Sequence, residues 1–136
     1  MKKKAIVLLP TLLIIIVAIA IYLNPLRKSE DQIRTNLLKI APIGTDMEEL
    51  IKIIEGNKKW EIVSISNISG YTLRWGQPTF ASPDDIASGK AIGKHSIVIY
   101  LGSYRNIFIT GVDVFWGFDE NSKLVDLHVR KSVDAL

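Results

Sequence analysis

The stretch that decides the fold is residues 95–131, HSIVIYLGSYRNIFITGVDVFWGFDENSKLVDLHVRK. It contains three runs rich in the β-branched and aromatic residues that are typical of strands: 95–101, 107–118 and 124–131. Short turns separate these runs, and short connections join consecutive antiparallel strands. The stretch therefore predicts a three-stranded antiparallel meander.

The alternation of residues indicates how these strands meet the rest of the protein. In the last run, Val125 and Leu127 alternate with polar residues, as in a strand with one face in water. The middle run is apolar on both faces, with Trp116 on one and Phe115 on the other. The two short helices expected upstream of the strands can cover only one face of the sheet. The second face must therefore meet the long loop at 76–94, another protein or a membrane surface.

Two further strand-like runs, at 60–66 and 71–75, come before the meander and bring the expected number of strands to about five. The loop between 71–75 and the meander, residues 76–94, lacks strand character. It carries one expected helical turn, Ser82–Ala87, with Ser82 as the cap and Pro83 at the first helical position.

Two short helices are expected upstream of the strands, each opened by a capping box: Ser29-Glu30-Asp31-Gln32 and Thr45-Asp46-Met47-Glu48. Two helices on one face of an antiparallel sheet form a two-layer domain. The predicted fold class is therefore α+β, with an N-terminal transmembrane helix followed by two short helices packed on an antiparallel sheet of about four to five strands.

The transmembrane helix is predicted from the start of the chain. Lys2, Lys3 and Lys4 precede an uncharged apolar run, Ala5 to Leu23. About 20 apolar residues cross a bilayer as a helix, and basic residues favour the cytoplasmic side. We therefore expect a single-pass protein of the cell membrane with its N-terminus in the cytoplasm and its C-terminal domain outside. Secretion after cleavage near Ala20 is the alternative.

This reading divides the chain into three parts. Residues 1–23 are the anchor or signal peptide, 24–28 the linker, and 29–136 the extracytoplasmic domain.

The sequence has no cysteine, which excludes disulfides, thiolate metal sites and thiol catalysis. Without Lys2, Lys3 and Lys4 the 17 basic side chains become 14, equal to the 14 acidic ones. A neutral domain of this kind argues against a nucleic-acid partner.

Only one pair of residues invites a catalytic interpretation. Asp126 and His128 share a face of the last expected strand, but a catalytic triad needs a base oriented toward a positioned hydroxyl. No nucleophile turn is present, and a solvated strand face explains the pair better. The two histidines also lack metal-site spacing. We expect no catalytic, cofactor or metal residues and no small-molecule substrate, with a small hydrolase using Asp126 and His128 as an alternative.

Aromatic residues form the one constellation that favours a binding function. Core packing explains most of them, and those left on the uncovered face of the sheet would make an interaction patch, because tryptophan and tyrosine dominate interface energetics. The predicted protein-binding patch consists of Trp60, Trp75, Tyr100 and Phe115.

Two motifs carry a family resemblance. Residues 44–51, GTDMEELI, resemble the helix start of the BamE/OmlA and β-lactamase-inhibitor-like fold, and 114–126, VFWGFDENSKLVD, resemble its late hairpin. Ser122 stands where that hairpin usually has glycine, and the lipid-bearing cysteine is missing. The resemblance spans about Leu37 to Lys131 and implies a two-layer α+β fold with a binding role in the envelope. It implies no particular functional residues.

The expected function is a membrane-anchored, extracytoplasmic protein-binding module of the bacterial envelope, with no catalysis. Its expected partners are another protein and, through Ala5 to Leu23, the membrane. An immunity-type protein that neutralises a toxin at the cell surface is the alternative with the same style of function.

Overall fold

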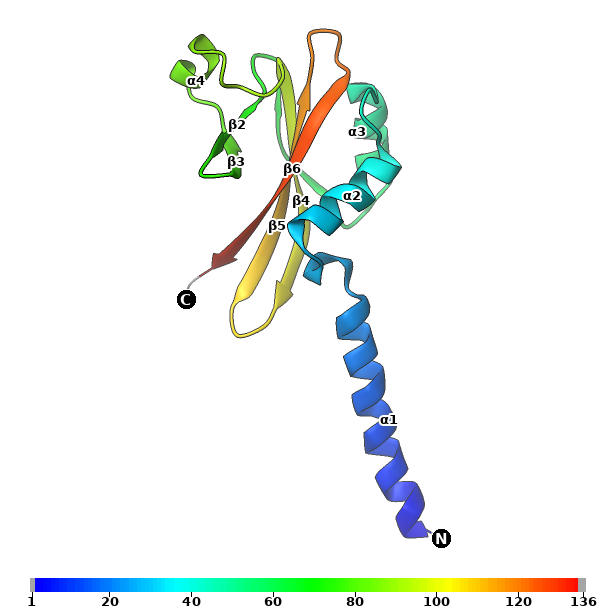
Figure 1. The fold of residues 1–136 in the computed structure, drawn as a ribbon. Helices are drawn as coiled ribbons and strands as arrows, with labels where there is room; N and C mark the ends of the chain where they lie inside the picture. The colour runs from blue at the N-terminus through cyan, green and yellow to red at the C-terminus, as the bar shows by residue number, and fades with distance from the viewer. Residues whose placement is uncertain (1, 135–136) are drawn as a thin grey trace.

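The computed structural model describes the backbone of residues 2–134 and the side chains of residues 10–134 (Figure 1). In chain order the elements are α1 (Lys2–Leu23), η1 (Pro25–Arg27), α2 (Glu30–Ile40), α3 (Met47–Glu55), β1 (Glu61–Ser66), β2 (Tyr71–Arg74), β3 (Gln77–Phe80), α4 (Pro83–Ala87), β4 (His95–Arg105), β5 (Ile109–Phe118) and β6 (Leu124–Asp134).

The main sheet has four strands in the order β1-β4-β5-β6, all antiparallel. The predicted meander of β4, β5 and β6 is confirmed, and β1 pairs with the outer side of β4. The prediction differs from the structure at the second strand. The run at 71–75 does not join this sheet but forms β2, which pairs with β3 in a separate hairpin.

One face of the sheet is covered by α2 and α3, while the β2–β3 hairpin and α4 lie on the other (Figure 1). The helix-covered face holds the main core. Its buried residues come from both helices and from β4, β5 and β6: Ile33, Leu37, Ala41, Met47, Leu50, Ile54, Ile97, Ile99, Leu101, Val112, Val114, Trp116, Phe118, Leu124, Leu127 and Val129. The expectation that two helices cover one face is confirmed.

The start of each helix tests the expected capping boxes. Ser29 Oγ accepts a hydrogen bond from the amide of Gln32, and Gln32 Oε1 accepts one from the amide of Ser29, so the first box is present. The second box is absent. Asp46 is the N-cap of α3 but makes no capping bond. Its carboxylate instead pairs with Lys123 at 2.7 Å, because the β5–β6 turn lies beside this helix end.

The segment between β1 and β4 closes the second face of the sheet. Its Tyr71 packs with Val98 and Phe115 in a small second core, against which Ile92 also lies. Glycine allows this close approach, since a Cβ at Gly70 would lie 1.7 Å from the carbonyl oxygen of Ile92. The structure also places β3 where the sequence lacked strand character, and it confirms α4, capped by Ser82 with Pro83 first.

The predicted transmembrane helix is wrong. Across the part of the chain that the structure describes, no helix combines the length and the apolar character needed to cross a membrane. The helix α1 spans Lys2–Leu23, and its described side chains begin at Pro10.

The linker expected at 24–28 is ordered against the domain. Pro25–Arg27 form the short helix η1, capped by Asn24, whose side chain accepts a hydrogen bond from the amide of Leu26 at 3.0 Å. Leu26 packs on the edge of the main core. The chain therefore reaches the sheet before α2 begins.

Candidate functional site

The four residues of the predicted binding patch do not share one surface. Trp60 packs against the main core, on the face that the helices cover. Tyr100 lies half-buried beside Gly111 of β5 on the opposite face. Trp75 is fully exposed in the turn of the β2–β3 hairpin, whereas Phe115 is completely buried. No continuous aromatic patch therefore exists among these four residues.

Phe115 was expected to be accessible and is not. Its ring meets Tyr71 of β2 at a centroid distance of 5.9 Å and Phe80 of β3 at 5.5 Å. The guanidinium of Arg130 lies 4.8 Å from the same ring and is held by Asp113 at 2.9 Å. The hairpin that covers Phe115 arises from the run that resembled a fifth strand of the sheet, which is why the sequence did not show the cover.

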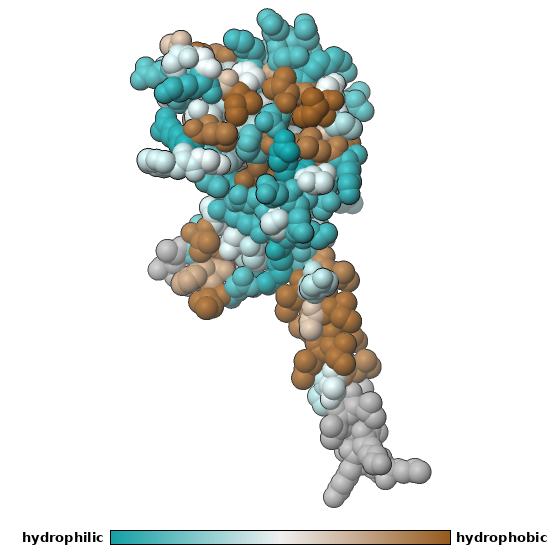
Figure 2. Space-filling view, viewed as in Figure 1, coloured by the Kyte–Doolittle hydropathy of each residue, from teal (hydrophilic) through white to brown (hydrophobic). Residues whose placement is uncertain are grey.

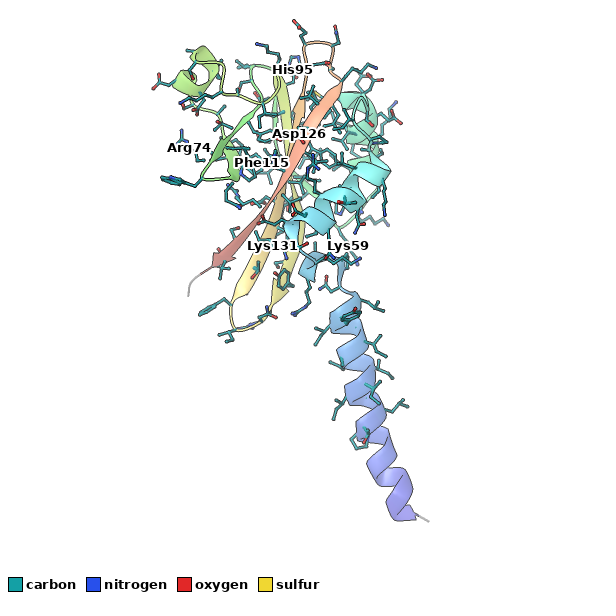
Figure 3. All side chains as sticks on the ribbon, viewed as in Figure 1. Lys59, Arg74, His95, Phe115, Asp126 and Lys131 are labelled. Carbon is teal, nitrogen blue, oxygen red and sulfur yellow. The ribbon has the colours of Figure 1, made fainter. Side chains whose placement is uncertain are left out.

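Asp126 and His128 are each engaged by a different neighbour. His128 Nδ1 lies 2.6 Å from the hydroxyl of Tyr71, and Asp126 accepts a hydrogen bond from Arg34 at 2.7 Å. Burial, and then the negative charge of Asp126, raises the pKa of the Tyr71 hydroxyl, which stays protonated. These contacts fasten β2 and α2 to the edge strand β6, on which Asp126 lies (Figure 3). They do not align a base with a nucleophilic serine.

A hydrolase using Asp126 and His128 would also need a nucleophile, for which Ser96 or Ser103 of β4 could be imagined. Ser96 Oγ donates a hydrogen bond to the carbonyl oxygen of Ser69 at 3.0 Å, and Ser103 is exposed toward the other end of β4. Among the described residues, no group of three or more histidine, aspartate or glutamate side chains is placed to hold a metal ion.

A groove on the helix-covered side of β1 is the feature best suited to bind a ligand. It has a volume of about 620 Å³ and lies between the first turns of α3 and the end of β1. From α3 it is lined by Glu48, Ile51 and Lys52, which lie on one face at i, i+3 and i+4. Opposite them, Ile65 of β1 is 45 % exposed. The groove is thus apolar at its floor and charged at its rim.

The backbone beside this groove is available for pairing. Within the described chain, β1 is an outer strand of the sheet, bonded to β4 on one side only. An outer strand presents unpaired amide and carbonyl groups, which can bond to a further strand. Val63 lies at an irregularity in the register with β4 and is 54 % exposed.

The charged side chains that line the groove at the start of α3 are mostly acidic. Asp46, Glu48 and Glu49 line it together with Lys52. Asp46 is neutralised by Lys123, and this hydrogen-bonded pair raises the pKa of the lysine. Glu48 and Glu49 are exposed on the first turn of α3. A basic side chain of a ligand would meet these two carboxylates.

Part of this site could be recognised from the sequence pattern. The helical spacing of Glu48, Ile51 and Lys52 is visible in it, but the position of Ile65 opposite them is not. That position follows from β1 being the outer strand next to β4, and the sequence pattern had placed 71–75 among the neighbouring strands instead.

No known protein family matches this chain, and no curated protein or solved structure is significantly similar to it. The resemblance to the BamE/OmlA-like fold therefore stays a prediction.

Proposed function

We propose that this protein is a non-catalytic binding module that accepts an extended segment of a partner protein along β1. The observation that supports it best is the free edge of β1 beside the groove lined by α3. An extended peptide can add to a free sheet edge by main-chain hydrogen bonds, while pockets for alternate side chains give specificity. The α3 groove provides such a pocket next to Ile65.

The chemistry of the groove defines the kind of segment. Its apolar floor, formed by Ile51 and Ile65, suits an aliphatic or aromatic side chain. Glu48 and Glu49 suit a lysine or arginine nearby, because rim charges of opposite sign favour encounter and fix the register. The expected ligand is an extended segment in which apolar residues alternate with basic ones.

The second part of the proposal is that α1 lies in contact with a lipid surface. Leu12, Leu13, Ile14, Ile15 and Ile16 are each about half-exposed or more. Contiguous exposed apolar surface of this kind marks an interaction site with protein or membrane. Apolar side chains on every side of the helix favour lipid as the partner.

A peptide-display selection on the full chain in detergent micelles tests the binding proposal. We expect enrichment of peptides that alternate apolar and basic residues, with affinity lowered about tenfold or more by Ile65→Lys, since a charge at this edge opposes pairing and fills the pocket. Glu48→Lys should shift the selection away from basic peptides.

The matched control is Ile68→Lys. Ile68 is 86 % exposed just beyond the end of β1 and does not line the groove. Peptides that bind equally well to wild type and Ile65→Lys, or a selection that yields no peptide at all, would count against strand addition at β1.

A further inference from the structure

The turn between β4 and β5 carries three consecutive apolar side chains in water. Ile107 is 83 % exposed, Phe108 47 % and Ile109 40 %. These three side chains belong neither to the core nor to the proposed groove, since the groove lies at the opposite end of β1 and β4. Single exposed apolar residues are common on protein surfaces, but clusters of them are not. Three consecutive exposed apolar residues at a hairpin tip therefore indicate a surface that contacts a partner.

This tip is fixed at the same end of the domain as α1. Arg27, which follows α1 in η1, donates a hydrogen bond to the carbonyl oxygen of Arg105 at 2.7 Å and another to Asn106 Oδ1. Its guanidinium also lies 5.0 Å from the ring of Tyr104. The tip and α1 project from the domain in the same direction (Figure 1).

At this end of the domain the apolar surface is separated from the hydrophilic surface. Brown apolar surface covers the hairpin tip and the described part of α1, and hydrophilic surface lies above both (Figure 2). On α1, Tyr22 is 86 % exposed and Leu23 66 %. A mainly hydrophilic band thus separates these two apolar projections from the upper part of the domain (Figure 2).

Several basic side chains lie near the two projections. Lys28 and Arg105 are exposed there, and Lys59 lies beside Leu26 and Leu23. Lys59 and Lys131 are seen close to η1 (Figure 3). The Lys131 amine donates to the carbonyl oxygen of Lys28 at 2.6 Å. Basic residues next to apolar anchors are attracted to anionic headgroups.

We propose that the β4–β5 tip enters the interfacial layer of an anionic lipid bilayer, as a second lipid contact beside α1. This inference rests on the lipid contact proposed for α1. The apolar side chains of Ile107 and Phe108 reach the boundary between headgroups and acyl chains, as amphipathic surface anchors do. Lys28, Lys59 and Arg105 face the headgroups. With two contacts the domain keeps a fixed orientation, and the β1 groove points away from the lipid.

The absence of cysteine from the sequence allows a direct test. An environment-sensitive fluorophore is attached to Ile107→Cys and, as the matched control, to Ile68→Cys. These isoleucines are 83 % and 86 % exposed and lie toward opposite ends of β4. Each labelled full-length chain is reconstituted into vesicles of equal parts phosphatidylcholine and phosphatidylglycerol, and flotation is measured with emission and quenching by aqueous iodide.

We expect the chain to float with the vesicles. The label at 107 should emit at shorter wavelength and lose most of its iodide quenching, while the label at 68 should stay fully quenched. Flotation with both labels equally quenched would overturn the inference and leave the α1 contact intact. A chain that does not float would overturn both.

Two further experiments distinguish lipid insertion from other causes of shielding at position 107. If a second copy of the chain covered the tip, shielding at 107 would fall as the ratio of protein to lipid is lowered, and this result would overturn lipid insertion. In vesicles of phosphatidylcholine alone we expect weaker shielding at 107, since the anionic headgroups are missing. Equal shielding in both lipids would overturn the role given to the basic residues.

Discussion

Phe115 is closed in by side chains from three strands: Tyr71 of β2, Phe80 of β3 and Arg130 of β6. Trp75 is just as aromatic but stands fully in water at a positive φ of 49°. Its place in a hairpin turn, rather than its residue type, leaves it exposed. For single residues, the neighbours that the fold brings in decide between core and surface.

The two rings give a direct prediction about stability. Phe115→Ala should lower the free energy of unfolding by about 3–5 kcal/mol, because a buried phenylalanine is replaced by a cavity. Trp75→Ala should change it by no more than about 0.5 kcal/mol. Urea unfolding followed by circular dichroism measures both. A mild effect of Phe115→Ala would mean that the β2–β3 hairpin does not cover the sheet in solution.

At the scale of elements, the sequence predicted those that depend on their own residues. The three strands of the meander, the Ser29 capping box and α4 follow from alternation, turns and caps that lie within each segment. The β2–β3 hairpin could not be predicted in the same way. The alternation in 71–75 indicates a strand but not its partner, and the partner β3 contains Pro78, which lowers its strand character.

The position of the hairpin depends on contacts distant in sequence. Tyr71 forms an isolated bridge with Ile92, and Gly117 leaves room for the carbonyl oxygen of Ile92 at the end of β5. Such contacts do not appear in any local pattern. The same holds for the binding groove, whose α3 face could be predicted while its β1 side could not.

The element α4 provides a prediction on pH. The amide and then the hydroxyl of Ser82 donate hydrogen bonds to Asp85, and Arg74 pairs with it at 3.2 Å, so the pKa of this carboxyl lies below its usual 3.8. A lowered pKa in the folded state stabilises α4 above about 3.8. This contribution is lost as the pH falls through the lower, folded value.

Limited digestion with pepsin, which cleaves at acid pH, measures this loss. Cleavage within 80–90 should increase as the pH falls below 3.8, before the main sheet opens. In Asp85→Asn the segment should be cleaved readily across the whole acid range, with little further dependence on pH. Asp84→Asn is the matched control and should behave like wild type. A cleavage profile of Asp85→Asn identical to that of wild type would contradict this role for the carboxyl.

At the scale of the whole molecule, the domain has a boundary earlier than the capping box at Ser29 indicates. Leu26 lies against Gly102 of β4, where a Cβ would come within 3.2 Å of its Cδ1. Arg27 binds the β4–β5 tip, as described above. The segment joining α1 to the domain is therefore part of the folded unit, and it fixes the direction in which α1 leaves it.

A pair of shortened chains tests this boundary. The chain 24–136 should fold without α1 and unfold cooperatively, because both core clusters of the described residues lie after residue 24. The chain 29–136 should fold too, but with a free energy of unfolding lower by about 2 kcal/mol. Partial exposure of the surface under Leu26 and the lost hydrogen bonds of Arg27 each contribute roughly 1 kcal/mol. Arg27→Ala in the chain 24–136 separates the two contributions and should account for about half of the difference. Equal stability of the two shortened chains in urea would show that η1 does not hold the sheet, and the common direction of α1 and the tip would lose its cause.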